Sequence, residues 1–391
     1  MTERLSALLR DEAAALDIPP VDQAAILARG RQARTPRRAT TWLAAAAVVA
    51  VVGAGSTWAL QGDGDRQTED RVADPAAEAG PSRGVVAYGA GSTVVVISPP
   101  VIRAGVPHRQ SAITDIPGTL HSLHYTSVGV LTRSNAQGGA SDGSGPESLT
   151  LVAADGTTTD LGTIPEGVGP ATDPDEDVYA LAEKSGDGFE VVVRDARTGD
   201  EVGSVPLPDL PMSYWPVPPL ALDGDVVYAG FEEEAYAVNW RTGEMQQAAG
   251  LGGGIPEVRG GFAYATGEKL NEETGALDLV VSVVDAATGA SALVVPLEQG
   301  EYGFGSLSPD GQYLSFTQQM GTNSGVDIYH VASQERVTLE GDGWGWTAGS
   351  SPFKVTKEGL EVCDPITAAC ETEPGPPVGQ NLRLGGNIYE S

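Results

Sequence analysis

The chain has 391 residues, enough for two ordinary domains or one large repeat domain, and its 51 Gly and 27 Pro indicate many turns. The formal net charge is −30, and the acidic excess lies in the C-terminal four fifths. From Asp63 onward, 48 Asp and Glu residues oppose 16 Lys and Arg residues. A body this acidic repels nucleic acid and anionic lipid, so a nucleic-acid-binding function is excluded.

Residues 1–38 are predicted to form a short cytoplasmic tail with short helices. Residues 2–17 carry four leucines at helical spacing. A second helix is indicated between Pro20 and Gly30, since Pro suits a helix start and Gly a helix end. Helices this short are marginal alone. The tail is therefore either a plain lead-in or a segment that folds onto a cytoplasmic partner.

Residues 39–62 are predicted to form a transmembrane helix. Residues 42–60 carry no charge and, at 1.5 Å per residue, span about 28 Å, close to the hydrocarbon thickness of a bilayer. Trp42 and Trp58 lie near its two ends, where indole rings favour the membrane interface. Five arginines precede this segment: Arg29, Arg31, Arg34, Arg37 and Arg38. The positive-inside rule then predicts a single-pass protein of the cell membrane, with its N-terminus in the cytoplasm and its C-terminal domain extracellular.

A cleaved signal peptide is the alternative interpretation of the same segment. Its apolar stretch is short and rich in Ala, and small residues around 56–59 could form a cleavage site. The leader of about 40 residues and the two flanking tryptophans favour an uncleaved signal anchor instead. Residues 63–83 follow without apolar periodicity and are predicted to be a flexible acidic linker.

Residues 84–391 repeat one turn at intervals of about 41 to 46 residues. The turn reads Asp-Ala-Arg-Thr-Gly at 195–199, Asn-Trp-Arg-Thr-Gly at 239–243 and Asp-Ala-Ala-Thr-Gly at 285–289. Its first side chain can cap backbone amides, and its Gly supplies the positive φ that a short hairpin requires. This period, with β-strand patterns between the turns, predicts an all-β fold, an extracytoplasmic β-propeller of seven blades, with six or eight as alternatives. The strand pattern at 382–391 is predicted to close the ring on the first blade.

One motif carries a resemblance to a known family. Residues 308–316 read Ser-Pro-Asp-Gly-Gln-Tyr-Leu-Ser-Phe, which resembles the WD40-like blade motif of TolB-type propellers. The Thr-Gly hairpins are also similar to those of quinoprotein-like propellers, but the Trp that usually follows them there is missing, so no quinone cofactor is expected. The order of tail, anchor and outer propeller resembles single-pass envelope proteins of GC-rich Gram-positive bacteria. The resemblance implies the fold and no particular activity.

The two cysteines, Cys363 and Cys370, bracket a further copy of the hairpin turn. Aligning Asp364 with Asp195 puts them at two positions that face each other across the hairpin. Outside the membrane the compartment permits oxidation, which favours a local disulfide over two free thiols.

Six aromatic residues are candidate ligand-binding residues. The alignment of blades places them where the chain enters an innermost strand, near one mouth of the central channel. Flat rings at such a mouth suit a peptide or glycan, although the same rings could instead wedge between neighbouring blades. The six residues are Tyr214, Trp215, Tyr302, Phe304, Trp344 and Trp346.

No local motif indicates a metal site or a catalytic site. His121 and His124 fall three residues apart in a strand pattern, so they are expected on opposite faces, which is poor geometry for a metal. Asp173, Asp175 and Asp177 resemble the start of a calcium loop but lack its Gly and distal Glu. The chain is therefore predicted to be non-enzymatic, without a cofactor or metal.

The resulting prediction is a membrane-anchored extracytoplasmic propeller that acts as a binding or scaffold module for a protein or envelope ligand. One alternative is a transmembrane sensor whose tail, residues 1–38, engages a cytoplasmic regulator such as a sigma factor. The other is an extracellular hydrolase or lyase built on the same propeller, which needs carboxylates or histidines that converge at a channel mouth.

Overall fold

The computed structural model describes residues 84–99, 101–103, 106–136, 145–212, 216–252, 256–270, 277–297, 303–318, 325–377, 379 and 381–386. The predicted cytoplasmic tail, membrane helix and acidic linker lie outside these residues. Within the described part of the chain, no helix has the length and apolar character that crossing a membrane requires.

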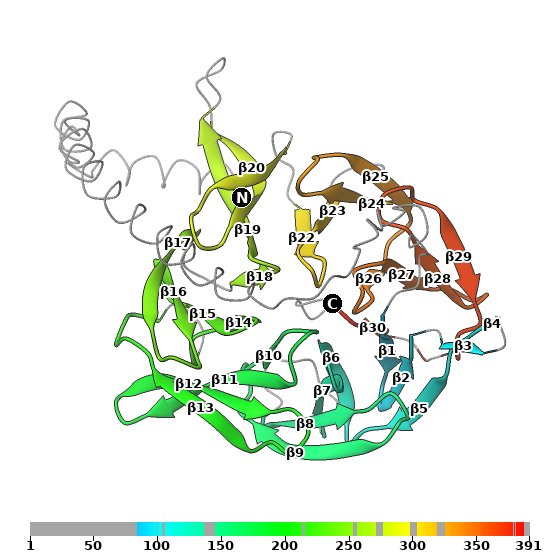
Figure 1. Ribbon diagram of the computed structural model, residues 1–391, viewed down its shortest axis with the longest axis horizontal. Helices are drawn as coiled ribbons and strands as arrows, with labels where there is room; N and C mark the ends of the chain where they lie inside the picture. The colour runs from blue at the N-terminus through cyan, green and yellow to red at the C-terminus, as the bar shows by residue number, and fades with distance from the viewer. Residues whose placement is uncertain are drawn as a thin grey trace, which may run out of the picture. The chain divides into compact units, whose positions relative to one another are not determined.

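The described strands form seven four-stranded antiparallel sheets, which confirms the predicted seven-bladed propeller. Figure 1 shows the sheets arranged around a centre, with the first strand of a blade innermost and the fourth at the rim. Blade 2 contains β6 (Thr119–Thr126), β7 (Gly129–Asn135), β8 (Glu147–Val152) and β9 (Thr158–Ile164). Blade 3 contains β10 (Ala171–Thr172), β11 (Val178–Ser185), β12 (Gly188–Asp195) and β13 (Glu201–Pro206).

The next four blades follow in chain order from the same pattern. Blade 4 contains β14 (Leu220–Asp223), β15 (Val226–Gly230), β16 (Glu234–Asn239) and β17 (Met245–Gly252). Blade 5 contains β18 (Glu257–Arg259), β19 (Phe262–Leu270), β20 (Leu277–Asp285) and β21 (Ser291–Pro296). Blade 6 contains β22 (Gly303–Leu307), β23 (Tyr313–Gln318), β24 (Gly325–His330) and β25 (Arg336–Glu340). Blade 7 contains β26 (Trp344–Trp346), β27 (Pro352–Val355), β28 (Leu360–Cys363) and β29 (Cys370–Glu373).

Blade 1 combines both ends of the propeller sequence. Its strand order is β30 (Arg383–Leu384), β1 (Val86–Ala90), β2 (Thr93–Ile97) and β5 (Ser111–Asp115), and a small hairpin of β3 (Val101–Arg103) and β4 (Val106–His108) lies between β2 and β5 in sequence. Tyr88 pairs with Leu384 and Gly89 with Arg383. The C-terminal strand therefore closes the ring on the first blade, as the sequence predicts.

The recurring hairpin turns have the predicted capping geometry. The Asp195 carboxylate accepts hydrogen bonds from the backbone N–H groups of Arg197 (2.8 Å) and Thr198 (3.0 Å). Asn239, Asp285 and Asp364 cap their own turns in the same way. Gly199 has φ of 76°, a conformation that Gly adopts most easily, although Gln334 (φ 62°) and Ala368 (φ 57°) adopt it at the same turn position in blades 6 and 7.

Seven clusters of buried apolar side chains hold the ring together, one at each blade interface. The middle strands bury both faces because each blade packs against two neighbours. Val191, Val192 and Val193 of β12, for example, are all buried. The cluster between blades 4 and 5 differs from the others, since five of its seven buried members are Ala.

Turns between the first and second strands interlock around one end of the central channel. Asp173 accepts a hydrogen bond from the Gly224 N–H of the next blade (2.7 Å). Asp223 accepts two from the N–H groups of Gly260 (2.9 Å) and Gly261 (2.8 Å) in the blade after that. These contacts fix the inner strands that carry the polar groups of the channel.

Candidate functional site

Three of the six candidate aromatic residues, Tyr214, Trp215 and Tyr302, lie outside the described residues. Phe304 lies in β22 and is 57% exposed, so it is available at the surface. Trp344 and Trp346 lie in β26 and pack into the cluster between blades 6 and 7. A ligand-binding role for the exposed members of the set stays a prediction.

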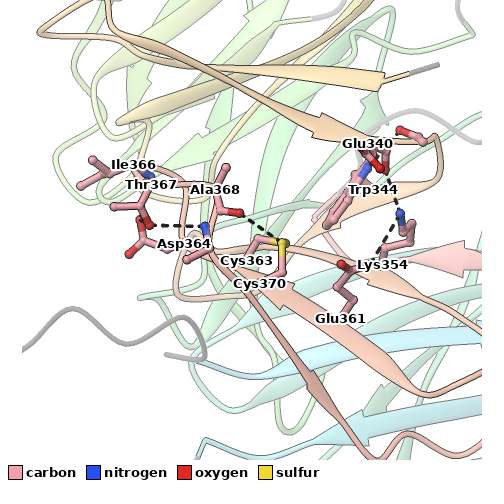
Figure 2. Close-up of a disulfide and its surroundings, with 12 residues drawn as sticks. Glu340, Trp344, Lys354, Glu361, Cys363, Asp364, Ile366, Thr367, Ala368 and Cys370 are labelled. Atoms are coloured by element: carbon pink, nitrogen blue, oxygen red, sulfur yellow. Dashed lines mark hydrogen bonds and ion pairs between the residues drawn. A yellow bond between two sulfur atoms is a disulfide. The ribbon is translucent and has the colours of Figure 1, made fainter. Parts of the chain in front are cut away.

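Trp346 is buried between two blades in this structure. It is only 1% exposed and stacks on Tyr313 at 6.5 Å between ring centroids, so it fills the interface between two blades. Its neighbour Trp344 is half-buried, donates a hydrogen bond to the Gly341 carbonyl and has the Lys354 ammonium 4.4 Å from its ring centroid (Figure 2).

The sequence repeats an aromatic-Gly-aromatic pattern at 302–304 and 344–346, but Phe304 and Trp346 do not occupy equivalent positions in their blades. Trp346 directly precedes the inner turn of blade 7, and the corresponding position in blade 6 is Leu307. Phe304 lies three residues before Leu307, so its side chain points to the opposite face of its strand. The two short segments lie 42 residues apart and look alike in sequence, but the side chains of Phe304 and Trp346 do not occupy the same position in the two blades.

Cys363 and Cys370 form a disulfide across the outer hairpin of blade 7 (Figure 2). They are directly paired, as are Arg194 and Glu201 in blade 3, which is the register predicted from the aligned turns. Among the described residues, the one group of three or more potential metal ligands is Glu361 with these two cysteines. The bridged sulfurs carry no thiolate, so this group does not form a metal site.

Reducing this disulfide is expected to lower the free energy of unfolding by about 2 kcal/mol, the amount that chain entropy gives for so short a loop. The ring should stay folded, because Leu360–Cys363 remains paired with Cys370–Glu373 through backbone hydrogen bonds. Urea unfolding with and without reductant measures the difference, and alkylation of unfolded, unreduced protein tests the bond. Two alkylated cysteines would contradict the pairing.

A buried ionic network lies in blade 2. His121 Nδ1 is 2.6 Å from Glu147 Oε1, and Arg133 Nε is 2.5 Å from Glu147 Oε2. Burial lowers the pKa of Arg133, whereas the negative charge of Glu147 raises it. Separating these side chains would leave an uncompensated buried charge, which is strongly destabilising. The network therefore fixes the relative positions of β6, β7 and β8, which carry His121, Arg133 and Glu147.

A second polar group lines the central channel. Arg259, at the end of β18, donates hydrogen bonds to the carbonyls of Thr172 (2.6 Å) and Leu222 (3.5 Å), and so joins blades 3, 4 and 5. His124 and Arg259 both line a small cavity in the channel. The Nε2 atom of His124 lies 2.8 Å from the Ser122 hydroxyl. Burial, together with the positive charges of Arg133 and Arg259, lowers the pKa of His124 to about 3, so the imidazole is neutral at pH 7.

The channel cavity next to these groups is too small for a substrate. It measures about 10 Å³, enough for about one water molecule. Its walls include His124, Tyr125, Thr172 and Arg259. This arrangement holds inner strands together, and it offers no space in which a neutral imidazole could act on a bound molecule.

A larger cavity lies between blades 4 and 5 of the described residues, towards the rim of the propeller. This cleft has a volume of about 670 Å³, within the range of small-ligand and peptide sites. Its walls come from β15, β16, β17 and the hairpin between β20 and β21. The lining residues are Val226, Tyr228, Ala237, Asn239, Glu244, Met245, Gln246, Ala248, Ala286 and Ala287.

Comparison with known proteins gives a likeness in fold alone. The chain matches no family model and no curated protein. Hydrazine synthase from Kuenenia stuttgartiensis is 16% identical over 63% of this chain and 76% of that one, with a TM-score of 0.39. TolB from Acinetobacter baumannii is 14% identical over 66% and 64%, with a TM-score of 0.42. The β-propeller domain of Cps50 (Swd1) from Myceliophteria thermophila is 14% identical over 75% and 95%, with a TM-score of 0.41.

The chain is a seven-bladed β-propeller. The propeller fold that the resemblance to TolB-type proteins implies is confirmed by the seven four-stranded sheets. At identities of 14% to 16%, these likenesses bring no ligand or activity to the chain.

Sequence reasoning missed both the ionic network and the cleft. At His121 and His124 the sequence indicated only poor metal geometry; Glu147, which pairs with His121, lies 26 residues away in sequence. The cleft does leave a trace in the sequence, because the hairpin at 239–243 has Trp-Arg after its capping residue, whereas the hairpin at 285–289 has Ala-Ala.

Proposed function

We propose that this protein is a membrane-anchored, extracytoplasmic binding module that presents its propeller to a partner protein. The cleft between blades 4 and 5 is the observation that carries the proposal, since it is a cavity of ligand size on a closed, rigid ring. Preformed concave sites on rigid scaffolds are the usual place of recognition.

Two features support a position outside the membrane. The Cys363–Cys370 bridge is typical of an oxidising compartment, and cytosolic proteins rarely keep such bonds. The five arginines before Trp42 and the acidic residues after Leu60 favour an uncleaved anchor with its N-terminus in the cytoplasm.

The non-enzymatic interpretation is supported by the chemistry of the channel. The hydrolase alternative needs carboxylates or histidines that converge on a space for substrate. Among the described residues, the buried Glu147 of blade 2 is paired with both His121 and Arg133, and the channel cavity beside His124 holds about one water molecule.

The topology can be tested with protease added to intact cells stripped of their wall. We expect the propeller to be digested and a short membrane-bound fragment that contains residues 1–38 to survive, because the bilayer shields that side. A mature protein whose first residue lies near position 60 would contradict the anchor. Crosslinking of the intact protein in its membrane then tests the binding role, and a propeller that captures no protein on the outer face would contradict it.

A further inference from the structure

At the cleft, blade 5 has two small side chains, Ala286 and Ala287, at the positions where blade 4 has Trp240 and Arg241; blade 3 has Ala196 and Arg197 there, so only blade 5 is small at both. In blades 3 to 6 the residue after the turn cap packs into the cluster shared with the preceding blade. Its N–H donates to an inner-turn carbonyl of its own blade, that of Asp225 for Trp240 and that of Gly261 for Ala286. Trp240 is 8% exposed and fills the interface between blades 3 and 4, where it approaches Gly203. The equivalent residue at the next interface is Ala286, which leaves this volume open.

The following position differs in the same way. Arg241 stacks on Trp240, with its guanidinium carbon 4.0 Å from the ring centroid, and reaches Glu176 of blade 3 at 3.5 Å. Its equivalent in blade 5 is Ala287, an exposed residue on the wall of the cleft. Blades 4 and 5 therefore lack both the packing and the cationic link that join blades 3 and 4.

A polar group inside the cleft has no protein partner among the described residues. Tyr228 is 6% exposed and lines the cleft, and within the described part of the chain its hydroxyl forms no hydrogen bond. The hydroxyl is therefore available to a ligand in the cleft. Burial raises the pKa of Tyr228 to about 12, and the carboxylates of Asp223 and Asp285 raise it as well, so the group stays neutral in an acidic surrounding.

The charge and the shape of the cleft narrow the choice of ligand. Its one charged lining residue is Glu244, and Lys and Arg are missing from the walls. Met245, 41% exposed, adds a flexible apolar side chain that adapts to different partners. Glu244 lies directly before β17, and Met245 is the first residue of that strand. Among the described strands, β17 is the last of its sheet. Its outer edge can therefore form backbone hydrogen bonds with an extended chain.

We propose that the cleft between blades 4 and 5 binds an extended segment of a partner protein in which an apolar side chain is flanked by Lys or Arg. The apolar side chain enters the space that Trp240 fills at the previous interface. The cationic side chains take the place of Arg241 and lie near Glu244. This inference rests on the proposed binding function and names the chemistry of the partner.

The test is selection of random nonapeptides displayed on phage against the full-length protein in detergent. Selected peptides are then synthesised, and their affinity is measured by fluorescence anisotropy. We expect enrichment of an apolar residue next to Lys or Arg. Ala287→Trp should weaken binding at least about tenfold by filling the cleft. The matched control is Ala332→Trp, an exposed residue at the equivalent position of the blade 6 hairpin, and it should leave the affinity unchanged.

A charge reversal gives a second test that does not depend on how a new Trp packs. Glu244→Lys should weaken the selected peptides, whereas Asp200→Lys, at the equivalent exposed position of blade 3, should not. Three results would overturn the inference: no enrichment, enrichment of acidic peptides, or equal binding to the Ala287→Trp and Ala332→Trp variants. In the last case the propeller still binds peptides, so its proposed function survives while the cleft is ruled out.

Discussion

Deleting residues 381–391, which contain β30, is expected to lower the free energy of unfolding by about 4 kcal/mol or more. The deletion removes Leu384, which is 8% exposed and contributes about 2 kcal/mol by burial. It also removes the hydrogen bonds that Gly385 forms with Ala87 (2.8 Å) and Trp346 (3.1 Å), at about 1 kcal/mol each. Loss of this strand further exposes the edge of β1, where Tyr88 is fully buried. Urea unfolding followed by Trp fluorescence measures the change.

A shorter deletion provides the control for this experiment. Removing only residues 387–391 keeps β30 and the contacts of Gly385, so the unfolding midpoint should stay close to that of the intact protein. Equal midpoints for the two deletions would show that pairing of β30 with β1 does not stabilise the ring. A propeller depends on closure because a single open interface exposes both a strand edge and an apolar cluster.

The fold could be predicted because its information is local and repeated. Each hairpin has a capping residue and a residue with positive φ at fixed spacing, and both requirements are visible within five residues, as at Asp195 and Gly199. The period of these hairpins, set against the length of residues 84–391, gives the blade number. The disulfide was predictable for the same reason, since the aligned hairpins place Cys363 opposite Cys370.

The sites were less predictable because they depend on contacts between blades. The six aromatics were aligned by spacing, but the number of residues between Trp346 and its turn differs from that between Phe304 and its turn, so the two side chains have different surroundings. The cleft depends on the lack of large side chains at the interface between blades 4 and 5. An Ala pair such as Ala286 and Ala287 shows its effect only beside the Trp240 and Arg241 pair in a structure.

Glu257 is expected to make the stability of the propeller depend on pH. It lies in β18, is fully buried, and accepts a hydrogen bond from the Leu307 N–H of the neighbouring blade (2.6 Å). Burial raises its pKa from 4.5 to about 7, although the Leu307 bond and the charge of Arg259 lower it in part. A raised pKa means that its contribution to stability is complete below pH 4.5, falls as the unfolded chain ionises, and is lost once pH rises through about 7.

The variant Glu257→Gln isolates this contribution, because Gln keeps the carbonyl that accepts the Leu307 bond and does not ionise. The difference of about 2.5 between the pKa of 4.5 and the raised value near 7 corresponds to about 3 kcal/mol. We therefore expect the variant to gain stability relative to the intact protein as pH rises from 5 to 8, by up to this amount. Urea unfolding at half-unit pH steps measures the gain, with Glu358→Gln, an exposed residue, as the control that should show none. Parallel stability profiles for the Glu257→Gln variant and the intact protein would mean that Glu257 ionises equally easily in the folded and unfolded chains.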